Sequence, residues 1–223
     1  MQIVELQNVL TVDELTSCVP LINSATWEDG RATAKGRAAA VKHNEQMSTS
    51  CPSYAQLSDC VRQALARHRE FFPRTLMARQ SPLLFNRHLP GMAYGGHYDT
   101  VMRPDIHGLP MRSDWSYTVF LSNPESYEGG ELAIAGSARV KLNAGSAIIY
   151  PSDTFHEVLP VTRGARFAAV GWLQSLVANR VERELLIELE RTASGLIAAN
   201  PNLPQADQLS GCVNRLLGLW ARP

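Results

Sequence analysis

The sequence predicts a mainly β protein of the jelly-roll class, with helices on either side of the β core in sequence. Three observations lead to this prediction. Residues 82–175 break into short apolar runs separated by turn residues, a pattern typical of antiparallel sandwiches and barrels. Both ends of the chain carry apolar residues at helical spacing. A chain of 223 residues is long enough to bury a core without disulfides or a structural metal.

The N-terminal segment is expected to be a mixed, mainly helical region that supports the core. Thr11 and Glu14 have the spacing of a capping box, and apolar residues follow them at helical intervals. Pro20 interrupts that pattern, so we expect the helix to kink or end there. A second helix is expected over residues 54–71, and Pro73 is expected to end it.

The middle segment carries the β prediction. Its short apolar runs end at Gly, Pro, Asn or Asp, which are the residues that favour turns. The expected strands are 83–89, 116–121, 131–134, 139–142, 147–150, 157–160 and 165–173. Strands do not alternate regularly with helical patterns, so a Rossmann fold or a TIM barrel is not expected.

The C-terminal segment predicts a helical hairpin. Its first helix has apolar residues every four positions, at Val177, Val181, Leu185 and Leu189. A second helix over residues 205–220 has an apolar stripe that is suited to packing on the core or to forming a homodimer. The expected division is a support region, a core that carries the candidate site and a helical hairpin, at residues 1–77, 78–175 and 176–223.

Composition and charge exclude several classes of protein. The 21 Lys and Arg residues balance the 21 Asp and Glu residues, so no basic excess indicates nucleic-acid binding. No apolar run is long enough to span a membrane, and the N-terminus lacks the pattern of a secretory signal. The four cysteines are scattered without a CxxC pair, as expected of buried thiols in a reducing compartment. The sequence therefore predicts a cytoplasmic protein.

A candidate metal site begins at His97 and Asp99. In a strand, residues i and i+2 point to the same face, so the two side chains are expected to converge. His156, which opens another predicted strand, is the best candidate for a third ligand. Two imidazoles and one carboxylate on one face leave coordination positions open, as in non-haem Fe(II) oxygenases. The H-x-D tripeptide alone is a weak signal, and Gly95 and Gly96 strengthen it because they let the backbone approach a metal or a ligand.

A candidate anion site lies ten residues after His156. Arg166 falls in a predicted strand of small residues, where a buried guanidinium is costly unless it binds an anion. Its planar fork matches a carboxylate, so a dicarboxylate co-substrate could bind the metal at one end and Arg166 at the other. Arg163 competes for this role, but its place beside Gly164 in an apparent turn favours the surface.

The order H-x-D, His156, Arg166 resembles that of the Fe(II)/2-oxoglutarate dioxygenases of the prolyl-hydroxylase type. More closely, the chain resembles the bacterial PKHD-type hydroxylases, the PiuC-like proteins associated with iron uptake. The resemblance covers nearly the whole chain and is most specific over residues 156–166. Its other motifs are WEDGR (27–31), the segment 41–46, PLLFNR (82–87), Tyr94 with HYD (97–99), TVFLS (118–122), YEGGEL (127–132) and YPS (150–152).

The resemblance implies a double-stranded β-helix and a role for each site residue. It implies that His97, Asp99 and His156 bind Fe(II) and that Arg166 binds 2-oxoglutarate. It also implies O2 as a co-substrate and ascorbate as the reductant of oxidised iron. Related prolyl hydroxylases often present a Tyr to the co-substrate upstream of H-x-D, and here the equivalents are His88 or Tyr94.

The implied reaction is hydroxylation of a primary substrate, with succinate and CO2 as co-products. Two alternatives remain at this point, a cupin-like metal enzyme that uses no keto acid and a sensor that binds iron and 2-oxoglutarate without catalysis. The primary substrate, whether peptide, siderophore or small molecule, is not indicated. Residues 102–114 are expected to form a long polar loop in which His107, Arg103 and Arg112 are mostly solvated.

Overall fold

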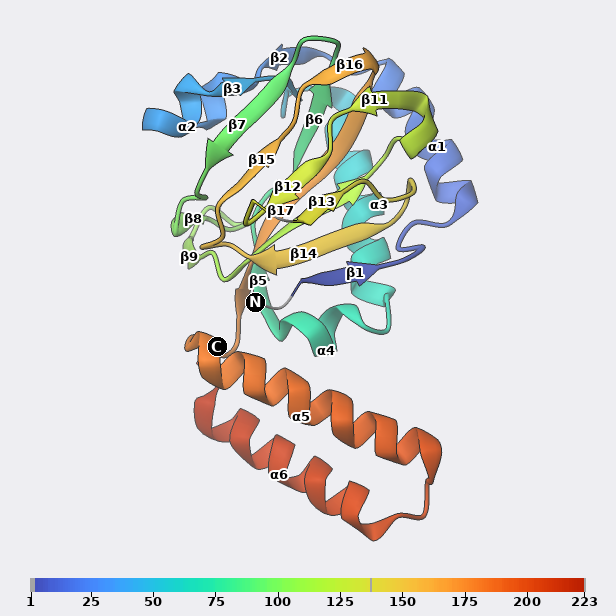
Figure 1. The fold of residues 1–223 in the computed structure, drawn as a ribbon, viewed down its shortest axis with the longest axis vertical. Helices are drawn as coiled ribbons and strands as arrows, with labels where there is room; N and C mark the ends of the chain where they lie inside the picture. Colours follow the sequence, from blue (N-terminus) through green and yellow to red (C-terminus); the bar gives the residue numbers. More distant parts are fainter. Residues whose placement is uncertain (1–2, 137, 223) are drawn as a thin grey trace.

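Two antiparallel β-sheets form the core of the protein in a computed structural model, which describes residues 3–136 and 138–222 (Figure 1). The major sheet comprises β1 (Val4–Leu6), β2 (Trp27–Asp29), β4 (Glu45–Met47), β5 (Met77–Gln80), β6 (Leu84–His88), β10 (Trp115–Phe120), β14 (Ala147–Pro151) and β17 (Arg166–Ser175). Its order is β1-β14-β10-β17-β6-β4-β2, and β5 also pairs with β17. The long strand β17 is therefore central, with partners along both edges.

The minor sheet faces the major sheet. It comprises β3 (Lys42–His43), β7 (Ala93–His97), β12 (Leu132–Ile134), β13 (Ala138–Val140) and β15 (His156–Val158), in the order β13-β12-β15-β7-β3. Two ribbons complete the β structure, one of β8 (Met102–Pro104) with β9 (Pro110–Arg112) and one of β11 (Tyr127–Gly129) with β16 (Val161–Gly164). The predicted jelly-roll core is confirmed, and each of the seven expected strands overlaps an observed one.

Alternation along β17 separates the core from the candidate site. Ala169 and Leu173 lie on one face, in the main hydrophobic cluster that the helices cover. Arg166, Val170 and Trp172 lie on the other face, where they line a cavity between the sheets. A second, smaller apolar cluster packs between the sheets and consists of Phe120, Leu132, Ile134, Val140, Ile148, Tyr150 and Val158.

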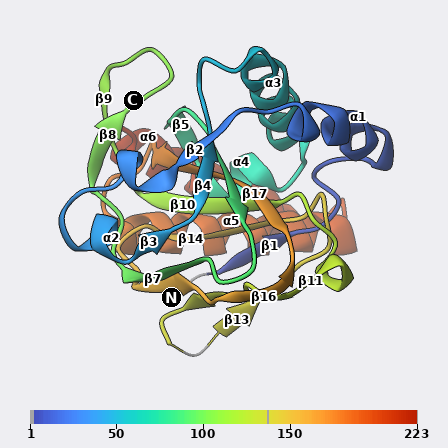
Figure 2. The same cartoon turned by 90° about the horizontal axis from the view of Figure 1, so that it is seen from above.

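Helices α1 (Val12–Asn23), α3 (Pro52–Arg67) and α4 (Phe71–Thr75) lie on the outer side of the major sheet (Figure 2). The predicted capping box is present, since the amide of Thr11 donates to Glu14 and the amide of Glu14 donates to Thr11. The expectation that Pro20 would end α1 early is wrong. Pro20 lies in the exposed last turn, where its missing N–H costs one terminal hydrogen bond.

The expected helix over 54–71 is two helices rather than one. α3 ends at Arg67, and Pro73 does not end it but lies in the first turn of α4, where a missing N–H leaves no acceptor unpaired. A short helix, α2 (Gly36–Ala40), and a 3₁₀ turn at Gly30–Thr33 follow β2 and lie beside the cavity. A further 3₁₀ turn spans Pro124–Ser126.

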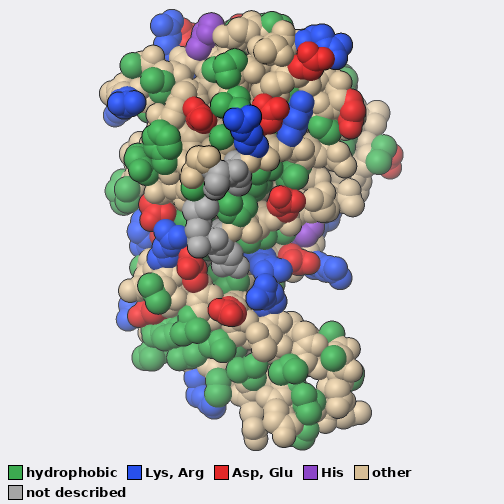
Figure 3. Space-filling view, in the orientation of Figure 1, with side chains coloured by type: hydrophobic (Ala, Val, Ile, Leu, Met, Phe, Trp, Pro, Cys, Tyr) green, Lys and Arg blue, Asp and Glu red, His purple; other side chains and the backbone are tan. Residues whose placement is uncertain are grey.

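The C-terminal hairpin of α5 (Arg180–Ala199) and α6 (Pro204–Trp220) is confirmed, but the buried face of α5 was predicted wrongly. Val181 is 75% exposed and Leu185 45% exposed, whereas Arg183, Leu186 and Ile187 are buried. Figure 3 shows hydrophobic side chains exposed on this hairpin, which extends away from the sheets. Arg183 of α5 is buried because it pairs with a buried carboxylate at the base of the hairpin.

That carboxylate belongs to Asp114. Asp114 accepts from the amide of Ser175 at 2.8 Å and from Arg112 Nε at 2.8 Å, and Arg183 Nη1 lies 3.2 Å from Asp114 Oδ1. Arg183 Nη1 also donates to the carbonyl of Val177 at 2.9 Å. Asp114 thus contacts both Arg183 of α5 and Ser175 at the end of β17, so this buried ion pair holds α5 against the sheet.

The expectation of a long polar loop at 102–114 is corrected. The segment is not an irregular loop, because β8 and β9 pair within it and Asp105 closes the turn by accepting from the amides of His107 and Leu109. Gly129 and Gly130 connect two strands of different sheets. Both have positive φ, and they carry the chain from β11 to β12, which pair with different partners.

The expectation of four buried thiols holds only in part. All four cysteines are free, with Cys18 and Cys51 buried, Cys60 half-buried and Cys212 exposed. Among the described residues, no helix is both long and apolar enough to cross a membrane.

Asp114→Asn is expected to lower the free energy of unfolding by about 3–5 kcal/mol, because it leaves the buried Arg183 guanidinium without its counter-ion. Urea denaturation followed by circular dichroism measures the change. Asp153→Asn is the matched control, because Asp153 pairs with Arg180 of the same helix at the exposed surface and its loss should cost less than about 1 kcal/mol. Equal losses for the two variants would contradict this role for Asp114.

Candidate metal and co-substrate site

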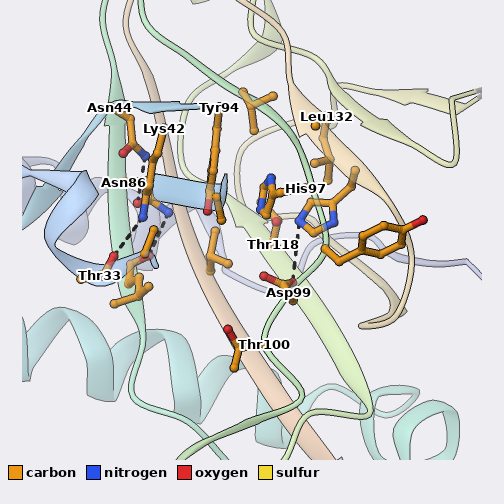
Figure 4. Close-up of a pocket in the computed structure, with 18 of the residues that line it drawn as sticks. Thr33, Lys42, Asn44, Asn86, Tyr94, His97, Asp99, Thr100, Thr118 and Leu132 are labelled. Atoms are coloured by element: carbon orange, nitrogen blue, oxygen red, sulfur yellow. Dashed lines mark hydrogen bonds and ion pairs between the residues drawn. The ribbon is translucent and has the colours of Figure 1, made fainter. Parts of the chain in front are cut away.

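The structure brings His97, Asp99 and His156 together. β7 and β15 are antiparallel neighbours, and His97 is paired directly with His156, so their rings lie 4.4 Å apart between centroids. Asp99 does not continue the strand as expected, but it lies just beyond the end of β7 and still reaches the same point. One ligand atom from each residue lies within 4.8 Å of the others, a spacing suited to a single metal ion (Figure 4).

Backbone carbonyls fix the orientation of both imidazoles. His97 Nδ1 donates to the carbonyl of Gly95 at 2.8 Å, and His156 Nδ1 donates to that of Thr154 at 2.9 Å. A carbonyl only accepts, so each Nδ1 carries a proton, and Nε2 is the ring nitrogen that could bind a metal. Burial and the neighbouring His156 lower the pKa of His97 to about 4, which keeps this ring neutral at pH 7.

The carboxylate of Asp99 is held by two residues that the sequence did not single out. Asp99 Oδ2 accepts from Ser116 Oγ at 2.6 Å and from Trp172 Nε1 at 2.8 Å. Ser116 and Trp172 are paired across β10 and β17 of the major sheet. The major sheet therefore positions the carboxylate of Asp99, which follows β7 of the minor sheet. Only the pairing of these strands reveals the contact, because the two residues are 56 positions apart.

Arg166 begins β17 and is only 2% exposed. Its Nε has no hydrogen-bond partner, and no carboxylate of the described residues lies within salt-bridge distance of its guanidinium. Burial lowers the pKa of Arg166, because no protein anion offsets the lost hydration. Gly130 makes room for this side chain, since a Cβ at Gly130 would lie 3.1 Å from Arg166 Cδ.

His88 and Tyr94, the two alternatives for a co-substrate contact, occupy different places. His88 is paired with Arg166 across β6 and β17, is buried, and has no hydrogen-bond partner for either ring nitrogen. Its pKa is well below the usual value because of burial and the nearby Arg166, so the ring is neutral. Tyr94 instead stacks on His97, with 3.7 Å between ring centroids. His88 is thus the neighbour of the guanidinium and Tyr94 the neighbour of the candidate metal ligands.

Of the other Arg and His residues considered from the sequence, only Arg103 lines the cavity. Arg163 is exposed and pairs with Glu128, so it does not compete with Arg166. His107 lies in the turn between β8 and β9 and is exposed, and Arg112 pairs with Asp114. Arg103 was expected to be solvated, yet it lies in the cavity with its guanidinium 3.4 Å from the centroid of Trp172.

A single cavity of about 600 Å³ is lined by the three candidate metal ligands and also by His88, Tyr94, Arg103 and Arg166. The donor set at one place, two imidazoles and one carboxylate, fits Fe(II). Elsewhere in the cavity, Arg166 Nε and both ring nitrogens of His88 have no hydrogen-bond partner, which fits an anion that the described residues do not supply. The cavity has a third polar region that sequence reasoning missed, around Lys42, Asn44 and Gln46. These residues alternate along the chain and are all buried, and that period of two was the available signal.

Comparisons with known proteins identify the family. Residues 83–174 match the 2OG-Fe(II) oxygenase superfamily. The chain is 41% identical over 220 residues to a PKHD-type hydroxylase of Xanthomonas campestris pv. campestris, covering 96% of each chain. It is 42% identical over 220 residues to a PKHD-type hydroxylase of Nitrobacter winogradskyi, covering 97% of each.

Among solved structures, the fold is similar to that of the non-heme α-ketoglutarate-dependent epimerase SnoN from nogalamycin biosynthesis. The TM-score is 0.54 at 14% identity, over 78% of this chain and 77% of the other. A prolyl hydroxylase of Trichoplax adhaerens gives a TM-score of 0.53 at 16% identity, over 78% and 83%. These structures establish the fold, and the close relatives in sequence establish the family. The chain belongs to the PKHD-type hydroxylases of the 2OG-Fe(II) oxygenase superfamily.

Proposed function

We propose that this hydroxylase binds Fe(II) through His97, Asp99 and His156 and binds 2-oxoglutarate through Arg166. The observation that carries the proposal is the buried guanidinium of Arg166, which has no hydrogen-bond partner at Nε and no carboxylate partner among the described residues, in the same cavity as the three clustered candidate ligands. A buried cation is costly unless an anion joins it, and a dicarboxylate chelated at the metal supplies that anion.

The protein prepares the metal ligands before any ligand binds. Two backbone carbonyls orient His97 and His156 with Nε2 directed to the common point. Ser116 and Trp172 both donate to Oδ2 of Asp99, which restrains the carboxylate rotamer, while Oδ1 lies 3.9 Å from Arg103 Nη2. Fe(II), when bound, supplies the activation of O2 that couples hydroxylation to loss of CO2 from 2-oxoglutarate, leaving succinate.

The rest of the cavity orients the co-substrate and excludes water. Arg166 presents a rigid fork of N–H donors to a carboxylate, and His88 beside it offers a further donor from a neutral ring. Leu132, Val158 and Val170 line the same space with apolar surface. In a cavity of low polarity a charge-assisted hydrogen bond is stronger than in water, so few contacts are enough to fix the dianion.

Four further parts of the proposal rest on the resemblance or on sequence features. The resemblance implies ascorbate as the reductant that returns oxidised iron to Fe(II), and a link to iron uptake. The free cysteines agree with a cytoplasmic protein. Exposed apolar side chains of the C-terminal hairpin, such as Val181, Leu185 and Leu219, are suited to a homodimer contact.

Purified protein given Fe(II), ascorbate and 2-oxoglutarate is expected to release succinate slowly without a primary substrate. His97→Ala, Asp99→Ala and His156→Ala should each abolish this release and the binding of Fe(II), because two ligands hold the ion poorly. Anaerobic equilibrium dialysis measures the bound iron, and chromatography measures succinate. His107→Ala is the control and should retain both. A triad variant that keeps iron and turnover would show the ligand assignment to be wrong.

Arg166→Leu should weaken 2-oxoglutarate binding by about two orders of magnitude while leaving Fe(II) affinity unchanged. The loss corresponds to about 3 kcal/mol, the contribution of a strong charge-assisted contact. Arg166→Lys should restore only part of the affinity, because an ammonium cannot reproduce the planar fork. Anaerobic titration of the iron-loaded protein with 2-oxoglutarate, followed by charge-transfer absorbance, gives the Kd. The exposed Arg163→Leu is the matched control, and weaker binding in that variant instead would move the co-substrate site.

His88→Leu should weaken 2-oxoglutarate binding by about tenfold, because it removes one hydrogen bond to a charged acceptor while filling similar space. His88→Gln, which keeps a donor, should retain most of the affinity. The same charge-transfer titration measures both variants. Tyr94→Phe should leave the Kd unchanged, and a larger effect of Tyr94→Phe than of His88→Leu would reverse the choice between these residues.

A further inference from the structure

The cavity has a second buried cation, Lys42, which the proposed chemistry does not use. Lys42 is 5% exposed, and its Nζ donates to Thr33 Oγ1 at 2.9 Å and lies 5.1 Å from the centroid of the Tyr94 ring. Figure 4 shows Lys42 on one side of Tyr94 and His97 on the other. The ring of Tyr94 therefore separates this ammonium from the candidate metal ligands.

Thr33 links the ammonium to a group of neutral amides. Gln46 Oε1 accepts from Thr33 Oγ1 at 2.6 Å, and Gln46 Nε2 donates to Asn86 Oδ1 at 2.8 Å. Asn44 Nδ2 also approaches Asn86 Oδ1, at 3.3 Å. No carboxylate among the described residues lies within salt-bridge distance of Lys42. The region thus contains a buried positive charge and polar groups, but no negative charge to match it.

The cavity wall as a whole carries a net positive charge. Its cationic side chains among the described residues are Lys35, Arg37, Lys42, Arg103 and Arg166. Asp99 is the only carboxylate among the described residues that line the cavity. The chain as a whole has no net charge, so this excess is local to the cavity. A bound dicarboxylate is matched by Arg166 and the metal, which leaves the charge near Lys42 unmatched.

The lowered pKa of Lys42 reflects the free-energy cost of burying this ammonium without a matching negative charge. Burial lowers the pKa of Lys42 to about 8, and the more distant Asp99 offsets only part of the effect. An anion placed against Nζ would recover the interaction that the lost hydration supplied. The aromatic pair Tyr98 and Phe155, 5.2 Å apart and both partly exposed, adds an apolar wall to the same cavity.

We propose that Lys42, with Gln46 and Asn86, binds a carboxylate of the primary substrate on the side of Tyr94 away from the metal ligands. The substrate class is therefore an organic acid, either a small molecule or an acidic side chain of a peptide, with an apolar part that packs against the aromatic wall. This assignment rests on the proposed function, because it treats the region as the substrate side of the hydroxylase cavity.

Two matched pairs of probes test the proposal by calorimetry on the anaerobic protein loaded with Fe(II) and 2-oxoglutarate. The small-molecule pair is benzoate and benzamide, and the peptide pair is acetyl-Ala-Asp-Ala-amide and acetyl-Ala-Asn-Ala-amide. In at least one pair the acid should bind at least about tenfold more tightly than its neutral partner, as expected for a buried charge-assisted contact. The pair that shows the preference identifies the source of the carboxylate.

Three variants localise the effect. Lys42→Met should remove the preference for the acid. Gln46→Glu, which places a carboxylate beside Thr33 and Lys42, should exclude the acid by supplying the missing anion from the protein. Lys35→Met removes an exposed cation from the same wall, and it should change the Kd of the acid by less than about fivefold, because exposed charges interact weakly.

The charge-transfer absorbance of the loaded protein separates failure of this proposal from failure of the proposed function. If that absorbance never forms in the wild-type protein, the proposed function fails. If it forms and neither acid is preferred, or if Lys42→Met keeps the preference, the substrate assignment is overturned. The same conclusion follows if the acid abolishes the absorbance, because the acid then displaces 2-oxoglutarate instead of binding at Lys42.

Discussion

The register between β7 and β15 is the constraint on which the site depends. These strands come from parts of the chain nearly sixty residues apart, and their pairing sets His97 directly opposite His156. Side chains alternate along a strand, so a slip of one residue would turn one imidazole to the other face of the sheet. The backbone carbonyls that accept from the two rings lie two residues before each histidine, so the same segments fix both the position and the orientation of both residues.

Buried charges in this protein are of two kinds, and the difference separates structure from function. Arg183 is buried with Asp114 as its counter-ion, and the pair joins α5 to the sheet. Arg166 and Lys42 are also buried, but no carboxylate of the described residues pairs with either. Folding must bear the cost of dehydrating these two cations, and only a ligand can offset it. The two unmatched cations mark a proposed co-substrate side and a proposed substrate side of the cavity.

Tyr94 stands between these two sides and is in contact with both. It stacks on His97 and lies beneath the ammonium of Lys42, and burial raises its pKa, so the ring remains a neutral phenol. A flat neutral ring in this position keeps Lys42 apart from the metal ligands without adding a charge. The family resemblance drew attention to Tyr94 as a co-substrate residue, whereas its contacts connect it with the metal ligands and the substrate side.

The sequence by itself determined the strands of the core and the helical hairpin, and it predicted four candidate site residues, because local patterns encode them. Alternation and turn residues mark a strand, a capping box marks the start of α1, and H-x-D with a later His and Arg marks the metal and anion groups. Only the tertiary structure decided which residues support them. Ser116 and Trp172 meet Asp99 through strand pairing, and Arg183 faces inward because Asp114 lies there. Such contacts depend on residues far apart in the chain, so their energies leave no periodic signal in the sequence.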